Sequence, residues 1–102
     1  MKDKPMPDTK KYRIRAALDF LNEKGRDTLS VRQLRVLLAC RKGAQTVRGL
    51  AQALNLSRPA ISRACDRLQG ENLLRRENDK AHGRSVNLHL TSLGAAFAAN
   101  FE

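Results

Sequence analysis

The segment LAQALNLSRPAISRACDRL, residues 50–68, constrains the fold of this chain more than any other segment. It holds two short helical patterns separated by Asn55, one of the few non-glycine residues that tolerate the left-handed conformation. Ser57 is a suitable N-cap for the second helix, and Pro59 falls in its first turn, where a missing N–H costs nothing. Because so tight a turn sets two helices at a steep angle, the segment predicts a helix-turn-helix whose second helix projects outward.

The second helix of this segment has two faces of opposite character. On a wheel of 3.6 residues per turn, Ile61 and Leu68 lie on one side, and Ser62, Arg63 and Arg67 lie on the other. One interpretation is an ordinary amphipathic helix with a solvated charged face. The other is a helix built for insertion into a polyanion, such as the major groove of DNA.

The charge of the whole chain bears on this choice. The 102 residues contain 20 Lys and Arg against 10 Asp and Glu, which gives a net charge of +10. Such an excess makes nucleic acid the first candidate partner and an anionic membrane surface the second, while a basic protein without a polyanionic partner is the third interpretation. The sequence has neither an apolar run of about 18 residues nor the apolar stretch of a signal peptide, so we expect a cytoplasmic protein that does not enter a membrane.

Periodicity predicts the remaining elements. Apolar spacing predicts helices at residues 10–25, 29–43, 46–54 and 92–101, and a two-residue alternation in SVNLHL, residues 85–90, predicts a strand that pairs with LLRREN, residues 73–78. The first helix carries an apolar stripe of Ile14, Ala17, Leu18 and Leu21. The last carries Leu93, Phe97 and Phe101, a line that either completes the core with the first helix, forms a dimer or binds a larger partner.

This order of elements is that of a winged helix-turn-helix. We therefore expect a mainly α protein with a small β-hairpin wing, organised as a flexible tail at residues 1–9 and a single domain at residues 10–102. The helix-turn-helix is expected at about residues 46–69 and the wing at about residues 73–90.

From about Leu29 to Leu93 the chain resembles the multiple-antibiotic-resistance regulator (MarR) family of bacterial repressors, as a short variant. The resemblance lies in TVRGLAQALNLSRPAISRACDRL, in ENLLRRENDKAHGRSVNLHLT and in the closing LTSLG. It implies a transcriptional regulator, a repressor, that binds double-stranded DNA sequence-specifically as a homodimer through its N- and C-terminal helices. In each half-site the recognition helix, residues 57–69, would enter the major groove, and the wing, residues 77–85, would lie in or near the minor groove. The resemblance leaves open whether a small-molecule effector acts on the protein.

Candidate DNA contacts lie at two helix N-termini, on the outer face of the recognition helix and in the wing. Helix N-termini favour phosphate, an arginine can read guanine, and a wing arginine can enter the minor groove. The alternatives are that Ser57 simply caps its helix, that Arg67 pairs with Asp66 or Glu71, and that Arg84 bonds the wing backbone. The predicted contacts are Thr46, Arg48, Ser57, Arg58, Pro59, Ser62, Arg63, Arg67, Lys80, His82 and Arg84.

A second class of function remains: a winged-helix module that binds another protein through its apolar C-terminal helix, with weak or no specific DNA binding. Catalysis has little support, because His82 and His89 are the only histidines and no pair of residues has catalytic or metal-ligand spacing. We expect no cofactor and no metal. Cys40 and Cys65 are on apolar stripes, so burial is favoured over a role in sensing oxidants.

Overall fold

The computed structural model describes residues 9–78 and 86–101, with side chains from Ile14 onward. The predicted tail up to residue 8 and the tip of the wing lie outside the described residues. The elements are α1 (Thr9–Glu23), α2 (Val31–Ala39), the 3-10 turn η2 (Cys40–Lys42), β1 (Gln45–Thr46), α3 (Val47–Leu54), α4 (Arg58–Gly70), β2 (Leu74–Asn78), β3 (Val86–Leu90), α5 (Ser92–Ala98) and the 3-10 turn η3 (Ala99–Phe101).

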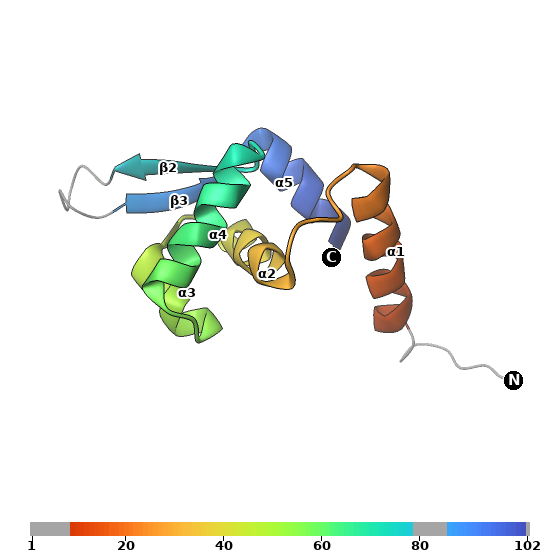
Figure 1. The fold of residues 1–102 in the computed structure, drawn as a ribbon, viewed down its shortest axis with the longest axis horizontal. Coiled ribbons are helices and arrows are strands. Elements are labelled where there is room, and N and C mark those ends of the chain that lie inside the picture. Colours follow the sequence, from red (N-terminus) through yellow and green to blue (C-terminus); the bar gives the residue numbers. More distant parts are fainter. Residues whose placement is uncertain (1–8, 79–85, 102) are drawn as a thin grey trace, which may run out of the picture.

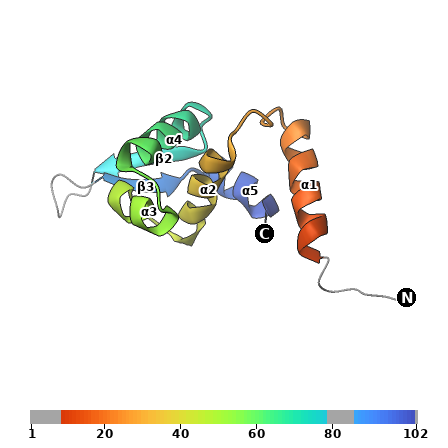
Figure 2. The same cartoon turned by 60° about the horizontal axis from the view of Figure 1, so that its bottom comes forward.

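Three helices and a small sheet form the body of the molecule. Helices α2, α3 and α4 pack on one another, and strands β2 and β3 extend from them to one side (Figures 1 and 2). Helix α1 stands at the opposite end, beside the C-terminal turn η3. This arrangement confirms the predicted mainly α fold with a β-hairpin, a winged helix-turn-helix.

The core lies where α2, α3 and α4 meet the hairpin. Side chains from each of these elements are excluded from solvent, which is the main favourable contribution to folding. The largest fully buried side chains are Val36, Leu37, Leu50, Ile61, Cys65, Leu68, Leu73, Leu74 and Leu88.

The sheet contains one strand more than the sequence predicts. Its order is β1-β3-β2 with antiparallel pairing, and Leu74 lies opposite Leu90 at the base of the hairpin. Strand β1 is the addition: it is two residues long, and Gln45 pairs with Leu88. Two residues are too few for an alternating pattern, which is why the sequence did not predict this strand.

The predicted helix caps are present in the structure. Ser30 and Gln33 form a reciprocal capping box, and Thr46 and Thr91 each accept a backbone hydrogen bond at the start of their helices. Asn55 ends α3 in the left-handed conformation, with φ 56° and ψ 49°. These local signals set the helix boundaries within a few residues of those predicted.

Helix α1 uses only part of its apolar stripe for packing within the chain. Leu21 is buried, but Ile14 is 64% and Leu18 is 59% exposed. The helix is held instead by Phe20, whose ring centroid lies 5.4 Å from that of Phe97 and 6.0 Å from that of Phe101. The sequence left three alternatives for the apolar line of the last helix: packing against the first helix, forming a dimer or binding a larger partner. For Phe97 and Phe101 the structure shows packing against the first helix.

Candidate nucleic-acid interface

The turn between α3 and α4 is fixed by backbone hydrogen bonds. The N–H of Leu56 donates to the carbonyl of Ala51 at 3.0 Å, and Leu56 packs against the core. Ser57 then caps α4 by accepting from the N–H of Ala60 at 3.2 Å. The turn is tight because Asn55 adopts the left-handed conformation at little cost, so α4 leaves the core at a defined angle.

Helix α4 buries one face and presents the other to solvent, as its sequence predicts. Its buried residues are Ala60, Ile61, Ala64, Cys65 and Leu68. On the opposite face Arg63 is exposed and has no hydrogen bond or ion pair to any described residue. Pro59 is exposed and Ser62 is half-buried on the same half of the helix. The guanidinium of Arg63 is thus available to a partner outside the chain.

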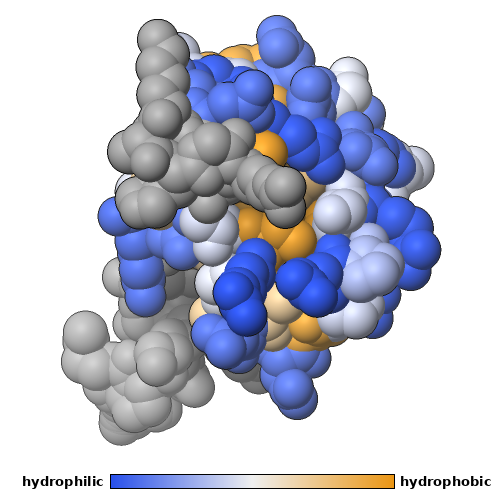
Figure 3. Space-filling view, turned by 90° about the vertical axis from the view of Figure 1, so that its left-hand side faces the viewer, coloured by the Kyte–Doolittle hydropathy of each residue, from blue (hydrophilic) through white to orange (hydrophobic). Residues whose placement is uncertain are grey.

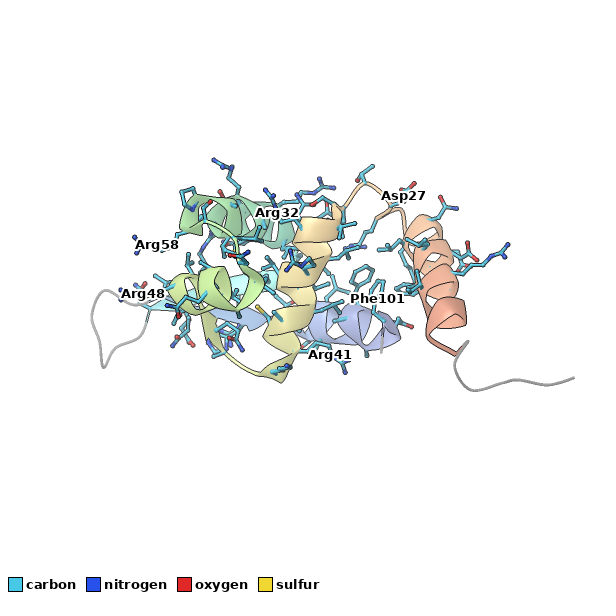
Figure 4. The ribbon with its side chains drawn as sticks, turned by 90° about the horizontal axis from the view of Figure 1, so that it is seen from below. Asp27, Arg32, Arg41, Arg48, Arg58 and Phe101 are labelled. Atoms are coloured by element: carbon cyan, nitrogen blue, oxygen red, sulfur yellow. The ribbon has the colours of Figure 1, made fainter. Side chains whose placement is uncertain are left out.

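Arg48 and Arg58 lie together although they come from different helices. Both are exposed, and both line a groove of about 330 Å³ at the helix-turn-helix with Ala51, Gln52 and Leu56. In Figure 4 the two arginines lie at the same end of the molecule, where α3 and α4 meet. Two cations over one groove are an arrangement suited to an anion such as a phosphate.

The two predicted N-terminal hydroxyls are used within the chain. Ser57 caps α4, and the hydroxyl oxygen of Thr46 accepts from the N–H of Gly49 at 2.9 Å. The capping role of Ser57 is therefore confirmed. A phosphate contact by either residue stays a prediction, since a capping hydroxyl still has a proton to donate.

Arg67 pairs with Glu71, which is one of the two partners that the sequence suggested as an alternative to DNA. Its Nε lies 3.4 Å from Oε2 of Glu71, and its Nη2 donates to the hydroxyl of Thr28 at 2.9 Å. Glu71 also forms an ion pair with Arg26, because Nε of Arg26 lies 3.6 Å from Oε1 of Glu71. Arg67 thus joins the end of α4 to the loop before α2, and a DNA contact from it would require these bonds to be shared or broken.

The three candidates in the wing, Lys80, His82 and Arg84, lie outside the described residues. The two strands on either side of them, β2 and β3, are described. They bring a further residue, Arg76 on β2, into contact with α4, and the sequence did not single it out. Its guanidinium bonds to Gln69, Asp66 and the carbonyl of Ser62, all on α4. A charged residue at an inward-facing position of a predicted strand, two residues after Leu74, was the signal that could have revealed it.

The surface around these residues is mainly hydrophilic. Figure 3 looks at the end of the molecule from which the hairpin extends, and hydrophilic side chains surround a small apolar strip there. None of the described helices is long and apolar enough to cross a membrane. Within residues 9–78 and 86–101, no group of three or more His, Cys, Asp and Glu is placed to hold a metal ion.

Both cysteines lie in the core, 3% and 0% exposed at Cys40 and Cys65. Burial raises the pKa of the Cys40 thiol to about 12, with a smaller contribution from Cys65. Burial also raises the pKa of Cys65, against an opposing effect of the nearby Arg76 guanidinium. Because the thiolate is the reactive form, both thiols are protonated and unreactive at neutral pH, which agrees with the predicted burial.

A helix pair joined by a tight turn and followed by an antiparallel hairpin defines a winged helix-turn-helix domain. The sequence profile of the MarR family matches residues 27–85, a range that includes α2, the helix-turn-helix and β2. The chain therefore belongs to the MarR family.

Solved structures with the same fold include two that contain DNA. A mutant of Escherichia coli MarR complexed with operator DNA matches with a TM-score of 0.71 and 24% identity, over 89% of this chain and 64% of that one. The Staphylococcus aureus MepR–DNA complex matches with a TM-score of 0.73 and 21% identity, over 89% and 71%.

A mutant of Lactococcus lactis ZitR matches with a TM-score of 0.67 and 24% identity, over 71% of this chain and 49% of that one. The chain thus spans about half of this ZitR chain and 64% of the DNA-bound MarR chain. At these identities the likeness shows a shared fold. A comparison with curated protein sequences gives no significant match.

Proposed function

We propose that this protein is a transcriptional regulator, a repressor, that binds double-stranded DNA sequence-specifically with α4 in the major groove. The observation that carries the proposal is the outward face of α4, where Arg63 is exposed and unpaired among the described residues. An arginine that donates to O6 and N7 of guanine contributes about 1–3 kcal/mol of discrimination between bases. Family membership and the fold shared with two DNA-bound proteins support the proposal.

The groove between Arg48 and Arg58 is the proposed phosphate site. Both guanidinium groups flank the N-terminal end of α4, where the helix dipole also favours an anion. The hydroxyl groups of Thr46 and Ser57 would donate hydrogen bonds to phosphates of the same DNA backbone. These contacts fix the register of α4 on the duplex and leave base selection to Pro59, Ser62 and Arg63.

The wing is proposed to lie in or near the minor groove. Lys80, His82 and Arg84 would supply its cations, with Arg84 inserted where the groove is narrow. Arg67 is a secondary candidate, because Glu71 and Thr28 already engage its guanidinium.

A second copy of the chain is the proposed partner in assembly. The side chains of Ile14 and Leu18 on α1 are mostly exposed and line a groove of about 200 Å³ with Leu34, Leu38 and Phe101 among others. Burying this apolar surface against the same surface of another protomer would give a two-fold dimer, which matches a pseudo-palindromic operator.

A salt titration of DNA binding tests the proposed function. Using DNA enriched from a random pool, we expect the logarithm of the association constant to fall linearly with the logarithm of salt concentration. Two phosphate-bound arginines per protomer make four phosphate contacts in the proposed dimer, which gives a slope of about −3.6 or steeper. Binding that is absent or insensitive to salt would favour the alternative of a protein-interaction module. That alternative has less support from the C-terminal helix itself, because Phe97 and Phe101 already pack on Phe20.

A further inference from the structure

Arg76 joins the wing to the proposed recognition helix. On β2 it alternates with Leu74, so both side chains lie on the sheet face turned toward α4. Its Nη1 donates to Oε1 of Gln69 at 2.6 Å, and its Nη2 donates to Oδ1 of Asp66 at 2.9 Å and to the carbonyl of Ser62 at 3.2 Å. One guanidinium therefore binds three acceptors on another element.

The three acceptors form one stripe of α4. Ser62, Asp66 and Gln69 follow the spacing i, i+4 and i+7, which places them on the same side of the helix over two turns. A planar guanidinium with donors in fixed directions holds such a set in one orientation, which a lysine cannot do. The stripe adjoins Arg63, so the group that orients the wing lies beside the residue proposed to read bases.

Arg76 also offsets an unfavourable charge. Asp66 is on the outward half of α4 with its side chain 70% exposed, where its carboxylate would repel DNA phosphates. The Nη2 atom of Arg76 lies 2.9 Å from Oδ1 of Asp66, and the Arg76 side chain is 29% exposed. Pairing the two keeps the acidic group from acting as a free anion at the interface.

We propose that Arg76 is a positioning residue for DNA binding: it fixes the wing at one angle to α4 and neutralises Asp66, so that helix and wing can engage adjacent grooves together. This inference rests on the proposed function. It assigns to Arg76 no contact with DNA.

The variant Arg76→Met tests the inference, with Arg75→Met as the matched control. Arg75 is on the same strand, loses the same charge, and pairs only with Glu77 among the described residues, on the other face of the sheet. We expect Arg76→Met to bind DNA on the order of tenfold more weakly at constant salt, and Arg75→Met within about twofold of the wild type. Equal effects of the two substitutions would contradict the inference, because they would report net charge alone.

Two further measurements separate positioning from a phosphate contact and from loss of folding. For Arg76→Met at saturating protein we expect retained protection of guanine N7, with loss of hydroxyl-radical protection under the wing and a smaller salt slope, because the cations of the wing no longer contact the DNA. A smaller slope with both protections retained would instead assign Arg76 a phosphate, and parallel loss of both protections would assign it only a role in stability.

A measurement without DNA tests the link between Arg76 and α4 separately from the proposed function. Amide hydrogen exchange in β2 and β3 of the free protein is expected to accelerate in Arg76→Met but not in Arg75→Met. The double variant Asp66→Asn, Gln69→Ala leaves the sheet untouched and should accelerate the same amides. Unchanged exchange in both would overturn the inference, whereas faster exchange in a protein that binds no DNA would retain the link and overturn the proposed function.

Discussion

At the scale of single residues, Gly94 shows why the segment LTSLG ends in glycine. A Cβ atom at this position would collide with the carbonyl oxygen of Leu73. That carbonyl accepts from the N–H of Thr91 at 3.1 Å, and the Thr91 hydroxyl donates to the carbonyl of Asn72 at 2.8 Å while it caps α5. The start of α5 is thus bonded to the start of β2 with no room for a side chain.

The substitution Gly94→Ala is expected to lower the free energy of unfolding by about 2–3 kcal/mol, because backbone rather than a flexible side chain must move. Gly70→Ala is the control, since an added Cβ there meets no atom within 4 Å. Its stability should be unchanged or higher by up to about 1 kcal/mol. Denaturant unfolding measures both, and equal stability of the two variants would contradict this account.

The Cys40 thiol gives a prediction about pH. Burial raises its pKa from 9.0 to about 12, so the unfolded chain loses this proton at a lower pH than the folded chain. The free energy of unfolding should therefore lose up to about 1.4 kcal/mol per pH unit from this group as pH rises from 9 toward 12. Cys40→Ala should have a shallower slope in that window, and identical slopes would show that the buried thiol does not contribute.

At the scale of elements, the helix-turn-helix depends on the left-handed residue at its centre. Asn55→Val should lower the free energy of unfolding by about 1–2 kcal/mol, because a β-branched residue fits the left-handed region poorly. Asn55→Gly should stay within about 0.5 kcal/mol of the wild type. If thermal unfolding gave the two variants the same midpoint, the turn would not be constrained as described.

Local chemistry made most elements predictable from the sequence. The capping residues Ser30, Thr46, Ser57 and Thr91 and the left-handed Asn55 act on neighbours within a few positions, so their effects can be inferred without a fold. The outward orientation of Arg63 could be predicted because the apolar residues of the same helix lie on the opposite face. The bond from Arg67 to Glu71 follows i,i+4 spacing and was therefore among the alternatives considered.

Features that depend on distant segments could not be predicted in the same way. Strand β1 exists only because β3 offers it a partner, and the orientation of α1 depends on the aromatic rings of Phe97 and Phe101. The bonds of Arg76 to α4 join residues 7 to 14 positions apart in sequence through a turn whose angle the sequence does not specify.

At the scale of the whole molecule, α1 leaves apolar surface that the proposed dimer would cover. Leu18→Glu places a charge in that surface and is expected to give a monomer in sedimentation equilibrium, whereas the wild type has twice the mass of one chain. Ala16→Glu is the control, because this exposed residue of α1 lies about 200° around the helix from Leu18. A wild-type monomer at tens of micromolar, or a dimer unaffected by Leu18→Glu, would contradict the proposed assembly.

The central claim is that the outward face of α4 selects DNA sequence, and binding-site selection from random DNA tests it most directly. For the wild type we predict a two-fold motif with half-sites about 10 bp apart, one helical turn. For Arg63→Ala we predict the same spacing with lost preference at one or two positions of each half-site and weaker binding. An unenriched pool for the wild type, or an unchanged motif and affinity for Arg63→Ala, would contradict the claim.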